Sequence, residues 1–188
     1  MAPRAAKKKI PFTMVRRSIW GSARFRSLPG SDAKLLYFYF LTCPHQTGTG
    51  CFVHNEAYAL ADLNKAGLNW TPDYYVNRKA EVEASGLVLS DHDTGEILID
   101  RWWGGAGPNN QKWFDGARVQ CGAIESPTLR QAAQESLQSA WAAFLESKGL
   151  TPALAQNAAS GLANGSGGVS SREEAKIRLQ ALRGGSAK

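Results

Sequence analysis

Hydrophobic and polar positions over residues 31–64 predict two helices separated by a short strand. A long apolar run follows Pro29, Gly30 and Ser31, and Cys43-Pro44 ends it. We therefore predict a buried helix that begins with Ser31 as its N-cap. Residues 51–53 predict a strand, and residues 55–64 predict a second helix. The inner positions expected for that second helix are Ala57, Leu60, Ala61 and Leu63.

The next stretch predicts a third helix and a β-hairpin. Thr71-Pro72-Asp73 combines a hydroxyl N-cap, a proline at the first helical position and an acid in the first turn, and Gly86 is a natural end. Residues 87–89 are expected to pair with residues 96–99 across a turn that contains Asp93-Thr94-Gly95. The order of helix, strand, helix, helix and hairpin is that of a winged helix-turn-helix domain.

The remaining segments predict tails and a helical extension. A linker at residues 104–109 precedes an expected helix over residues 111–121 and a longer one that begins at Ser126-Pro127 and ends at Gly149. The longer helix carries an apolar stripe that predicts either core packing or self-association as a homo-oligomer. The stripe consists of Leu129, Ala133, Leu137, Ala140, Trp141, Phe144 and Leu145.

The C-terminal residues predict a flexible linker and one short helix. Residues 157–171 are rich in Gly, Ser, Ala and Asn, whereas residues 172–183 carry basic and apolar side chains behind a capping box of Ser171 and Glu174. This helix would be marginal alone in water, so it is either a partner-binding segment that folds on binding or a solubilising tail.

The predicted fold is mainly α with a small β-hairpin, in four parts. These are a basic N-terminal arm (1–26), a winged-helix domain (27–103), a helical extension (104–149) and a flexible linker with a short terminal helix (150–188). The chain has 188 residues and a net charge of +6, but the charge is uneven. Residues 1–26 hold eight basic and no acidic residues, whereas residues 27–100 hold four basic and ten acidic ones. A basic end of this kind is typical of nucleic-acid binding.

The chain resembles winged-helix replication-initiation proteins of bacteriophages and prophages. The resemblance covers roughly residues 16–130 and rests on structural motifs, among them Ser18-Ile19-Trp20, Arg24-Phe25-Arg26, Ala61-Asp62-Leu63 and the stretch from Ile97 to Trp102. It implies binding to origin DNA and recruitment of a replicative helicase or helicase loader. One departure is Lys79, which stands where the family pattern expects an apolar residue. Either its stem lies along the core with the charge outward, or the helix is rotated.

The third predicted helix and the arm supply the candidate DNA-binding residues. In the helix, Tyr75 and Val82 are expected to face inward, and Tyr74, Asn77, Arg78 and Glu81 outward. Asn and Arg pair with bases in the major groove, although this face also fits an ordinary solvated helix. Trp20 and Phe25 in the arm either stack on bases or, as we favour, pack on the first helix. The candidate DNA-binding residues are Lys7, Lys8, Lys9, Arg16, Arg17, Arg24, Arg26, Tyr74, Asn77, Arg78 and Lys79.

Other candidate sites have less support in the sequence. The hairpin turn at Asp91-His92-Asp93 is acidic and would repel phosphate. Cys43, His45, Cys51 and His54 are zinc-competent residues, but their spacing is not that of a standard finger. The sequence lacks G-x-x-x-x-G-K-[ST] and G-x-S-x-G motifs, so we predict no enzymatic activity and no cofactor.

The sequence therefore predicts a DNA-binding protein of phage-type replication initiation in a bacterial or phage-infected cytoplasm. The longest apolar run is too short to span a membrane, so no membrane partner is expected. Two alternatives stay open. One is a winged-helix transcription regulator, and the other is a protein-interaction adaptor that does not bind DNA directly.

Overall fold

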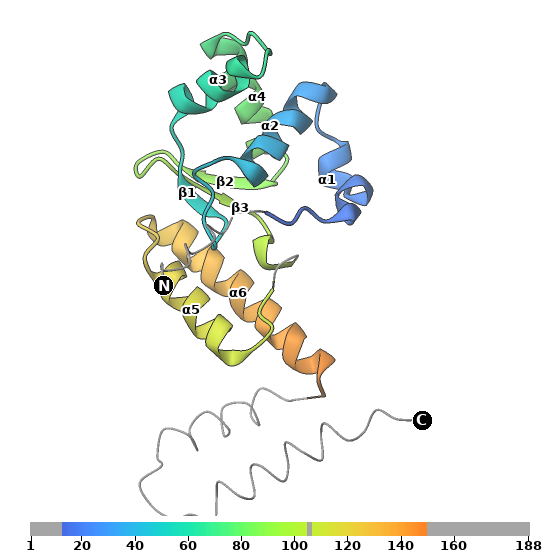
Figure 1. The fold of residues 1–188 in the computed structure, drawn as a ribbon, viewed down its shortest axis with the longest axis vertical. Coiled ribbons are helices and arrows are strands. Elements are labelled where there is room, and N and C mark those ends of the chain that lie inside the picture. The colour runs from blue at the N-terminus through green and yellow to red at the C-terminus, as the bar shows by residue number, and fades with distance from the viewer. Residues whose placement is uncertain (1–12, 105–106, 150–188) are drawn as a thin grey trace, which may run out of the picture. The chain divides into compact units, whose positions relative to one another are not determined.

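A computed structural model describes residues 13–104 and 107–149 of the chain. The described part is mainly helical, with one small antiparallel sheet (Figure 1). The chain divides into two compact units, residues 1–144 and 145–188, and the structure describes only residues 145–149 of the second. Everything that follows concerns the first unit.

The helices largely follow the sequence prediction. Two short helices at the N-terminal side, η1 (Arg17–Gly21) and α1 (Ala23–Arg26), were not predicted. The helices α2 (Gly30–Thr42), α3 (Glu56–Lys65) and α4 (Pro72–Ala84) confirm the three predicted over residues 31–86. After the short η2 (Trp102–Gly104) come α5 (Gln111–Gly122) and α6 (Pro127–Ser147), which confirm the two predicted for the extension.

Capping side chains set where several helices begin. The side chain of Asn55 accepts a hydrogen bond from the backbone N–H of Tyr58 at the start of α3. Thr71 does the same for Tyr74 at the start of α4, as predicted, and Pro72 occupies the first helical position. The predicted cap of α2 was wrong. That helix begins at Gly30, so Ser31 lies inside its first turn and bonds to Asp32 instead.

The sheet has three strands, one more than the predicted hairpin. The strands β1 (Cys51–Val53), β3 (Glu96–Ile99) and β2 (Val88–Asp91) lie in that spatial order, and both pairings are antiparallel. The second strand starts at Val88, one residue later than predicted, and extends to Asp91. The central strand β3 has every residue buried because it is covered on both faces and paired on both edges.

Alternation along the strands divides the core between the two faces of the sheet. Ile97 and Ile99 of β3 join Phe52 in a first core with α2, α3 and α4. Leu98 joins Cys51 in a second core with Trp103, α5 and α6. Cys51 lies opposite Leu98, and Phe52 opposite Ile97, so paired residues share a face. Helices therefore cover both faces of the sheet (Figure 1).

Two residues that were predicted to face inward on α3 do not do so. Ala57 and Ala61 of α3 are exposed, whereas Ala59 and Leu63 are buried, because α3 meets the first core along a narrower stripe than expected.

On α6, three residues of the predicted apolar stripe, Leu129, Ala133 and Leu137, are buried in the second core. For these three positions the stripe is core rather than a self-association surface.

The hairpin formed by β2, β3 and their turn is attached to the first turn of α6 by two acidic side chains. The buried carboxylate of Glu96 accepts hydrogen bonds from the backbone N–H groups of Glu125, at 3.1 Å, and Ser126, at 2.7 Å. Ser126 Oγ donates to Asp91 at 2.5 Å and also caps α6 by accepting from the N–H of Leu129. Carboxylates at a helix N-terminus are stabilised by its unpaired N–H groups and dipole.

Within the described ranges, none of the helices is both long enough and apolar enough to span a membrane.

Candidate nucleic-acid interface

The helix α4 presents the face that the sequence predicted. Tyr75 and Val82 are buried, which confirms their inward orientation, and Tyr74 and Asn77 are exposed. Arg78 and Glu81, which were also expected to face outward, are only partly exposed. The reason is that their side chains lie along the helix surface and bind each other.

Arg78 is engaged by its own helix. Its guanidinium donates to Glu81 at 2.8 Å and lies over the ring of Tyr74, 4.9 Å from the ring centre. Tyr74 in turn donates its hydroxyl to Asp32 of α2 at 2.7 Å, and this bond raises the pKa of the phenol. The positive charge of Arg78 is therefore balanced before any partner arrives.

Lys79 is also balanced, and it is buried. Its ammonium group contacts Glu56 of α3 at 3.0 Å and Glu83 of α4 at 3.4 Å. Only 8% of the residue is exposed. Because Tyr75 and Val82 remain buried, the helix is not rotated. The lysine stem lies along the core as the first alternative held, but its charge is not outward, because the ammonium group is enclosed between Glu56 and Glu83.

A buried histidine lies beneath the same helix. His54 Nε2 is 2.6 Å from the hydroxyl of Tyr75, and the two rings stack. Burial, reinforced by the nearby charge of Lys79, lowers the pKa of His54 to about 4. His54 is therefore neutral at physiological pH, and it is partly buried against Tyr75, Phe40 and Phe52.

The N-terminal segment, which we define as residues 13–26, packs on α2 by its aromatic side chains. Phe25 is 1% exposed and contacts the rings of Tyr37 and Phe38. Trp20 lies against Phe25 and Phe38 but keeps 66% of its surface exposed. The favoured alternative, packing on the first predicted helix, is thus confirmed for both rings. The segment has a fixed base on the protein.

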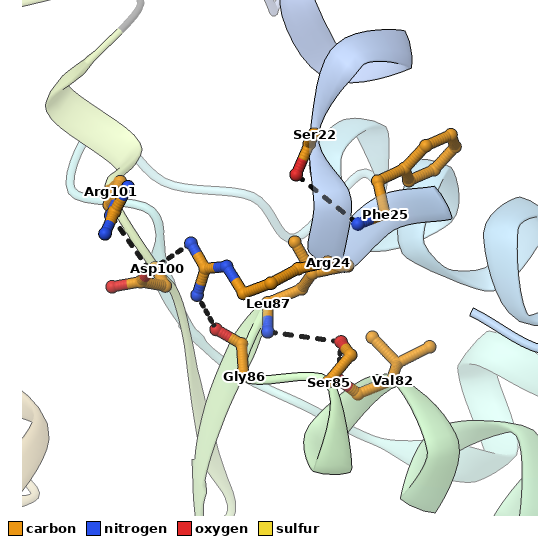
Figure 2. Close-up of polar contacts among 9 residues, drawn as sticks. All are labelled: Ser22, Arg24, Phe25, Val82, Ser85, Gly86, Leu87, Asp100 and Arg101. Carbon is orange, nitrogen blue, oxygen red and sulfur yellow. Dashed lines mark hydrogen bonds and ion pairs between the residues drawn. The ribbon is translucent and has the colours of Figure 1, made fainter. Parts of the chain in front are cut away.

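Arg24 has a structural position within this segment. Figure 2 shows its side chain reaching from α1 to the end of the sheet, where it donates to the carbonyl of Gly86 and to Asp100. The ion pair with Asp100 spans 2.7 Å. Gly86 has φ +69°, a conformation that glycine adopts without strain, and a Cβ there would touch the guanidinium. Arg24 holds the segment to the sheet, so its charge is already used.

Three other arginines of the segment have no acidic partner among the described residues. Arg16, Arg17 and Arg26 are exposed, and no ion pair within the described ranges includes them. The segment itself contains no acidic residue. The structure therefore separates the predicted site into balanced cations on α4 and unbalanced cations on the N-terminal segment.

A groove of about 910 Å³ lies beside the N-terminal segment, and sequence reasoning missed it. Its lining comes from the segment, the C-terminal end of α2, the loop after it and the end of β3. The lining includes two arginines, Arg16 and Arg101, and two tryptophans, Trp102 and Trp113. The Arg101-Trp102 pair was a possible signal, because a cation and an aromatic ring are adjacent there, but only the fold brings Arg16 and Trp113 to the same place.

The four zinc-competent residues are not brought together. Cys43 belongs to the first core and Cys51 to the second, on opposite faces of the sheet. His54 bonds to Tyr75, and His45 stacks on the ring of Tyr58. The part of the chain that the structure describes holds no group of three or more His, Cys, Asp or Glu side chains placed to bind a metal ion.

Two parts of the predicted site lie outside the described residues. These are Lys7, Lys8 and Lys9 of the arm, and the helix expected over residues 172–183.

Comparisons of the chain with protein-family models, with curated proteins and with solved structures find no match in any of the three.

Proposed function

We propose that the chain is a non-enzymatic DNA-binding protein with a winged-helix domain, acting in phage-type DNA replication initiation. The fold supports this through the order α2, β1, α3, α4, β2 and β3, which is the element order of a winged helix. The sheet supports it through the third strand, β1, which pairs with the hairpin as an extra edge. The role in replication rests on the family resemblance of the sequence.

The observation that carries the proposal is the unbalanced charge of the N-terminal segment. Arg16, Arg17 and Arg26 project from a segment anchored by the buried Phe25 and by Arg24. Cations on a fixed base bind phosphates with a small loss of conformational entropy. Phosphate contacts of this kind release counterions and supply most of non-specific DNA affinity.

The helix α4 has a smaller part in this proposal. Asn77 is exposed, and its amide is suited to pair with an adenine edge in the major groove. Arg78 and Lys79 bring no net charge, because Glu81, Glu83 and Glu56 balance them. We therefore assign base reading to Asn77 and anchoring to the N-terminal segment.

The hairpin has no DNA-binding part in the proposal. Its acids Asp91 and Glu96 bind the first turn of α6, so their negative charge has a structural use. This is why an acidic hairpin is compatible with a DNA-binding protein. The hairpin therefore contacts the first turn of α6, in the helical extension, and does not contact phosphates.

A second candidate function is a protein-interaction adaptor. The observation that favours it is the internal charge balance of α4 together with two exposed apolar side chains, Tyr58 at 61% and Val76 at 48%. Such a surface suits a protein partner better than a phosphate backbone. The proposed helicase or helicase-loader partner, assigned to residues 172–183, rests on the sequence alone.

The test is the salt dependence of DNA affinity in a triple variant, Arg16→Ala with Arg17→Ala and Arg26→Ala. The slope of log affinity against log salt should fall by up to about 2.7, since each lost phosphate contact contributes about 0.9. The control is Lys112→Ala with Arg118→Ala, two exposed cations on α5. If DNA binding depends on where the cations lie and not on the total charge, the control variant should have the same slope of log affinity against log salt as the wild type.

An unchanged slope in the triple variant excludes the N-terminal segment as the anchor. Absence of any salt-sensitive DNA binding by the full chain favours the adaptor. Footprinting separates the two DNA-binding alternatives, because a replication protein protects an origin whereas a transcription regulator protects a promoter.

A further inference from the structure

The groove beside the N-terminal segment combines the two chemistries that an unpaired nucleotide requires. It is lined by the aromatic rings of Trp102 and Trp113 and by the side chains of Arg16 and Arg101. Aromatic rings stack on bases of any sequence, and arginines bind the phosphates between them. Its volume of about 910 Å³ lies within the range of about 300–1,000 Å³ common for ligand sites.

The charge of the groove favours an anion. Its charged lining residues are Arg16, Arg24, Arg101 and Asp100, and Arg24 is balanced by Asp100. Arg101 also lies near the Asp100 carboxylate, at 3.6 Å, but Arg24 is closer to it (Figure 2). The side chain of Arg101 is 83% exposed. The lining therefore keeps a net positive charge. The same charge argues against the chain's own residues 1–12 as occupant, because that stretch is basic.

The tryptophan at the centre of this lining is held in place. Trp102 Nε1 donates to the carbonyl of Gly48 at 2.8 Å. Its ring packs against Gly50, which has φ +75°, and a Cβ on Gly50 would overlap the ring. A ring fixed in this way loses little rotamer freedom when a base stacks on it.

Two cations, Arg16 and Arg101, line the same groove as Trp102. Arg101 directly precedes Trp102 and has φ 54°, a left-handed conformation that non-glycine residues rarely adopt. The guanidinium of Arg16 lies beside Gly104, two residues after Trp102, where a Cβ would come within 3.1 Å of it. Cations from two separate segments thus line the same groove as Trp102.

From this geometry we propose that the groove binds an unpaired nucleotide of single-stranded DNA, with the base on Trp102 and the phosphates on Arg16 and Arg101. The inference rests on the proposed DNA-binding function and adds a preference for melted DNA. A duplex keeps its bases stacked inside, so it cannot use the tryptophan, whereas a locally opened strand can.

The experiment uses the full chain and three probes of about 12 nucleotides: a single strand, its duplex, and an abasic single strand of the same length. Trp102→Ala should weaken single-strand binding about 5- to 100-fold and leave duplex binding unchanged. Trp20→Ala is the matched control, since Trp20 is exposed and outside the groove. Trp102→Phe should recover most of the affinity because it keeps a ring for stacking.

Arg101→Ala and the abasic probe keep the test independent of whether the Trp102 variants fold. Arg101→Ala removes an exposed side chain and should lower the salt slope for the single strand more than for the duplex. The wild-type chain should bind the abasic strand more weakly than the normal strand. Equal binding of both strands overturns the inference, as do Trp102→Ala and Arg101→Ala variants that bind the single strand as the wild type does.

The outcomes separate this inference from the function beneath it. Salt-sensitive duplex binding without any preference for bases or for Trp102 retains the proposed function and removes the nucleotide site. If neither DNA form is bound in a salt-sensitive way, both fall. If the groove binds a protein segment instead, DNA binding will show no dependence on bases or on Trp102, or there will be no salt-sensitive DNA binding at all. Either result overturns the inference.

Discussion

The helix α4 and the N-terminal segment both carry cations, but they differ in what those cations contact. On α4, Arg78 is bound by Glu81, and Lys79 by Glu56 and Glu83. On the N-terminal segment, only Arg24 has an acidic partner among the described residues. The difference teaches that a count of basic residues overstates the charge available for binding. A guanidinium that already donates to a carboxylate must break that contact before it can bind a phosphate.

The largest expected effect concerns the buried histidine beneath α4. Its folded-state pKa of about 4 lies below the ordinary value of 6.5, so folding favours the neutral form. The stability from this group is complete above pH 6.5 and is lost as the pH falls toward 4, to a total of about 3 kcal/mol. Urea unfolding across this pH range should show the loss.

The matched variants for that measurement are His54→Gln and His92→Gln. His54→Gln removes the titrating group from the core and should flatten the dependence of unfolding free energy on pH between 6.5 and 4. His92 is exposed on the hairpin turn, so His92→Gln should retain the wild-type dependence. Equal curves for the wild type and His54→Gln would contradict a buried, neutral His54.

The second prediction compares Arg24, which is paired with Asp100, with Arg26, which is exposed on the same short helix, α1. Arg24→Ala removes contacts to Gly86 and Asp100 and should lower the unfolding free energy by about 1–3 kcal/mol. Arg26→Ala, at an exposed position, should change it by less than about 0.5 kcal/mol. Chemical denaturation measures both values.

DNA titration of the same two variants should give the reverse order. Arg26→Ala should lower the salt slope by about 0.9, whereas Arg24→Ala should leave it unchanged under conditions where the variant is folded. Equal effects of the two variants on stability would remove the distinction between an anchoring arginine and a binding arginine.

The smallest expected effect comes from releasing a cation on α4. Glu81→Gln removes the carboxylate that binds Arg78 and leaves the guanidinium over the ring of Tyr74. If α4 faces DNA, the freed charge should raise the salt slope by about 0.9. The control is Glu135→Gln on α6, which should have no effect. A slope that does not change with Glu81→Gln would place α4 away from the phosphate backbone.

The elements were predictable from the sequence where local chemistry determines them. Thr71 and Pro72 define the start of α4, and the apolar run after Pro29 defines α2, although its N-cap was placed two positions too late. The pairing of β1 with β3 was not predictable, because three residues such as Cys51–Val53 carry no signal for the strand they join. The short helices η1 and α1 were missed because they depend on packing against α2.

The candidate site was less predictable than the fold because part of its charge balance comes from residues that are distant in sequence. Lys79 and Glu56 are far apart in sequence, as are Arg24 and Asp100, and only folding brings each pair together. The acids of the hairpin suggested repulsion from phosphate, but their partner is the N-terminus of α6, some 30 residues further along the chain. The spacing of Arg78 and Glu81, and of Lys79 and Glu83, does indicate local pairing on α4, but no local pattern shows that Arg24 is paired while Arg26 is not.

The attachment of the hairpin to α6 has a consequence for how the protein is made. Asp91 and Glu96 find their partner at Ser126, which lies 35 and 30 residues later in the chain. At a translation rate of roughly 5–20 residues per second, Ser126 is added about 2–7 s after these acids. Until α6 follows, the sheet face that carries Cys51 and Leu98 lacks the cover of Leu129, Ala133 and Leu137. A chain that stops between residues 104 and 126 would expose this apolar face to other nascent chains, and it should accumulate as aggregate rather than as a smaller working domain.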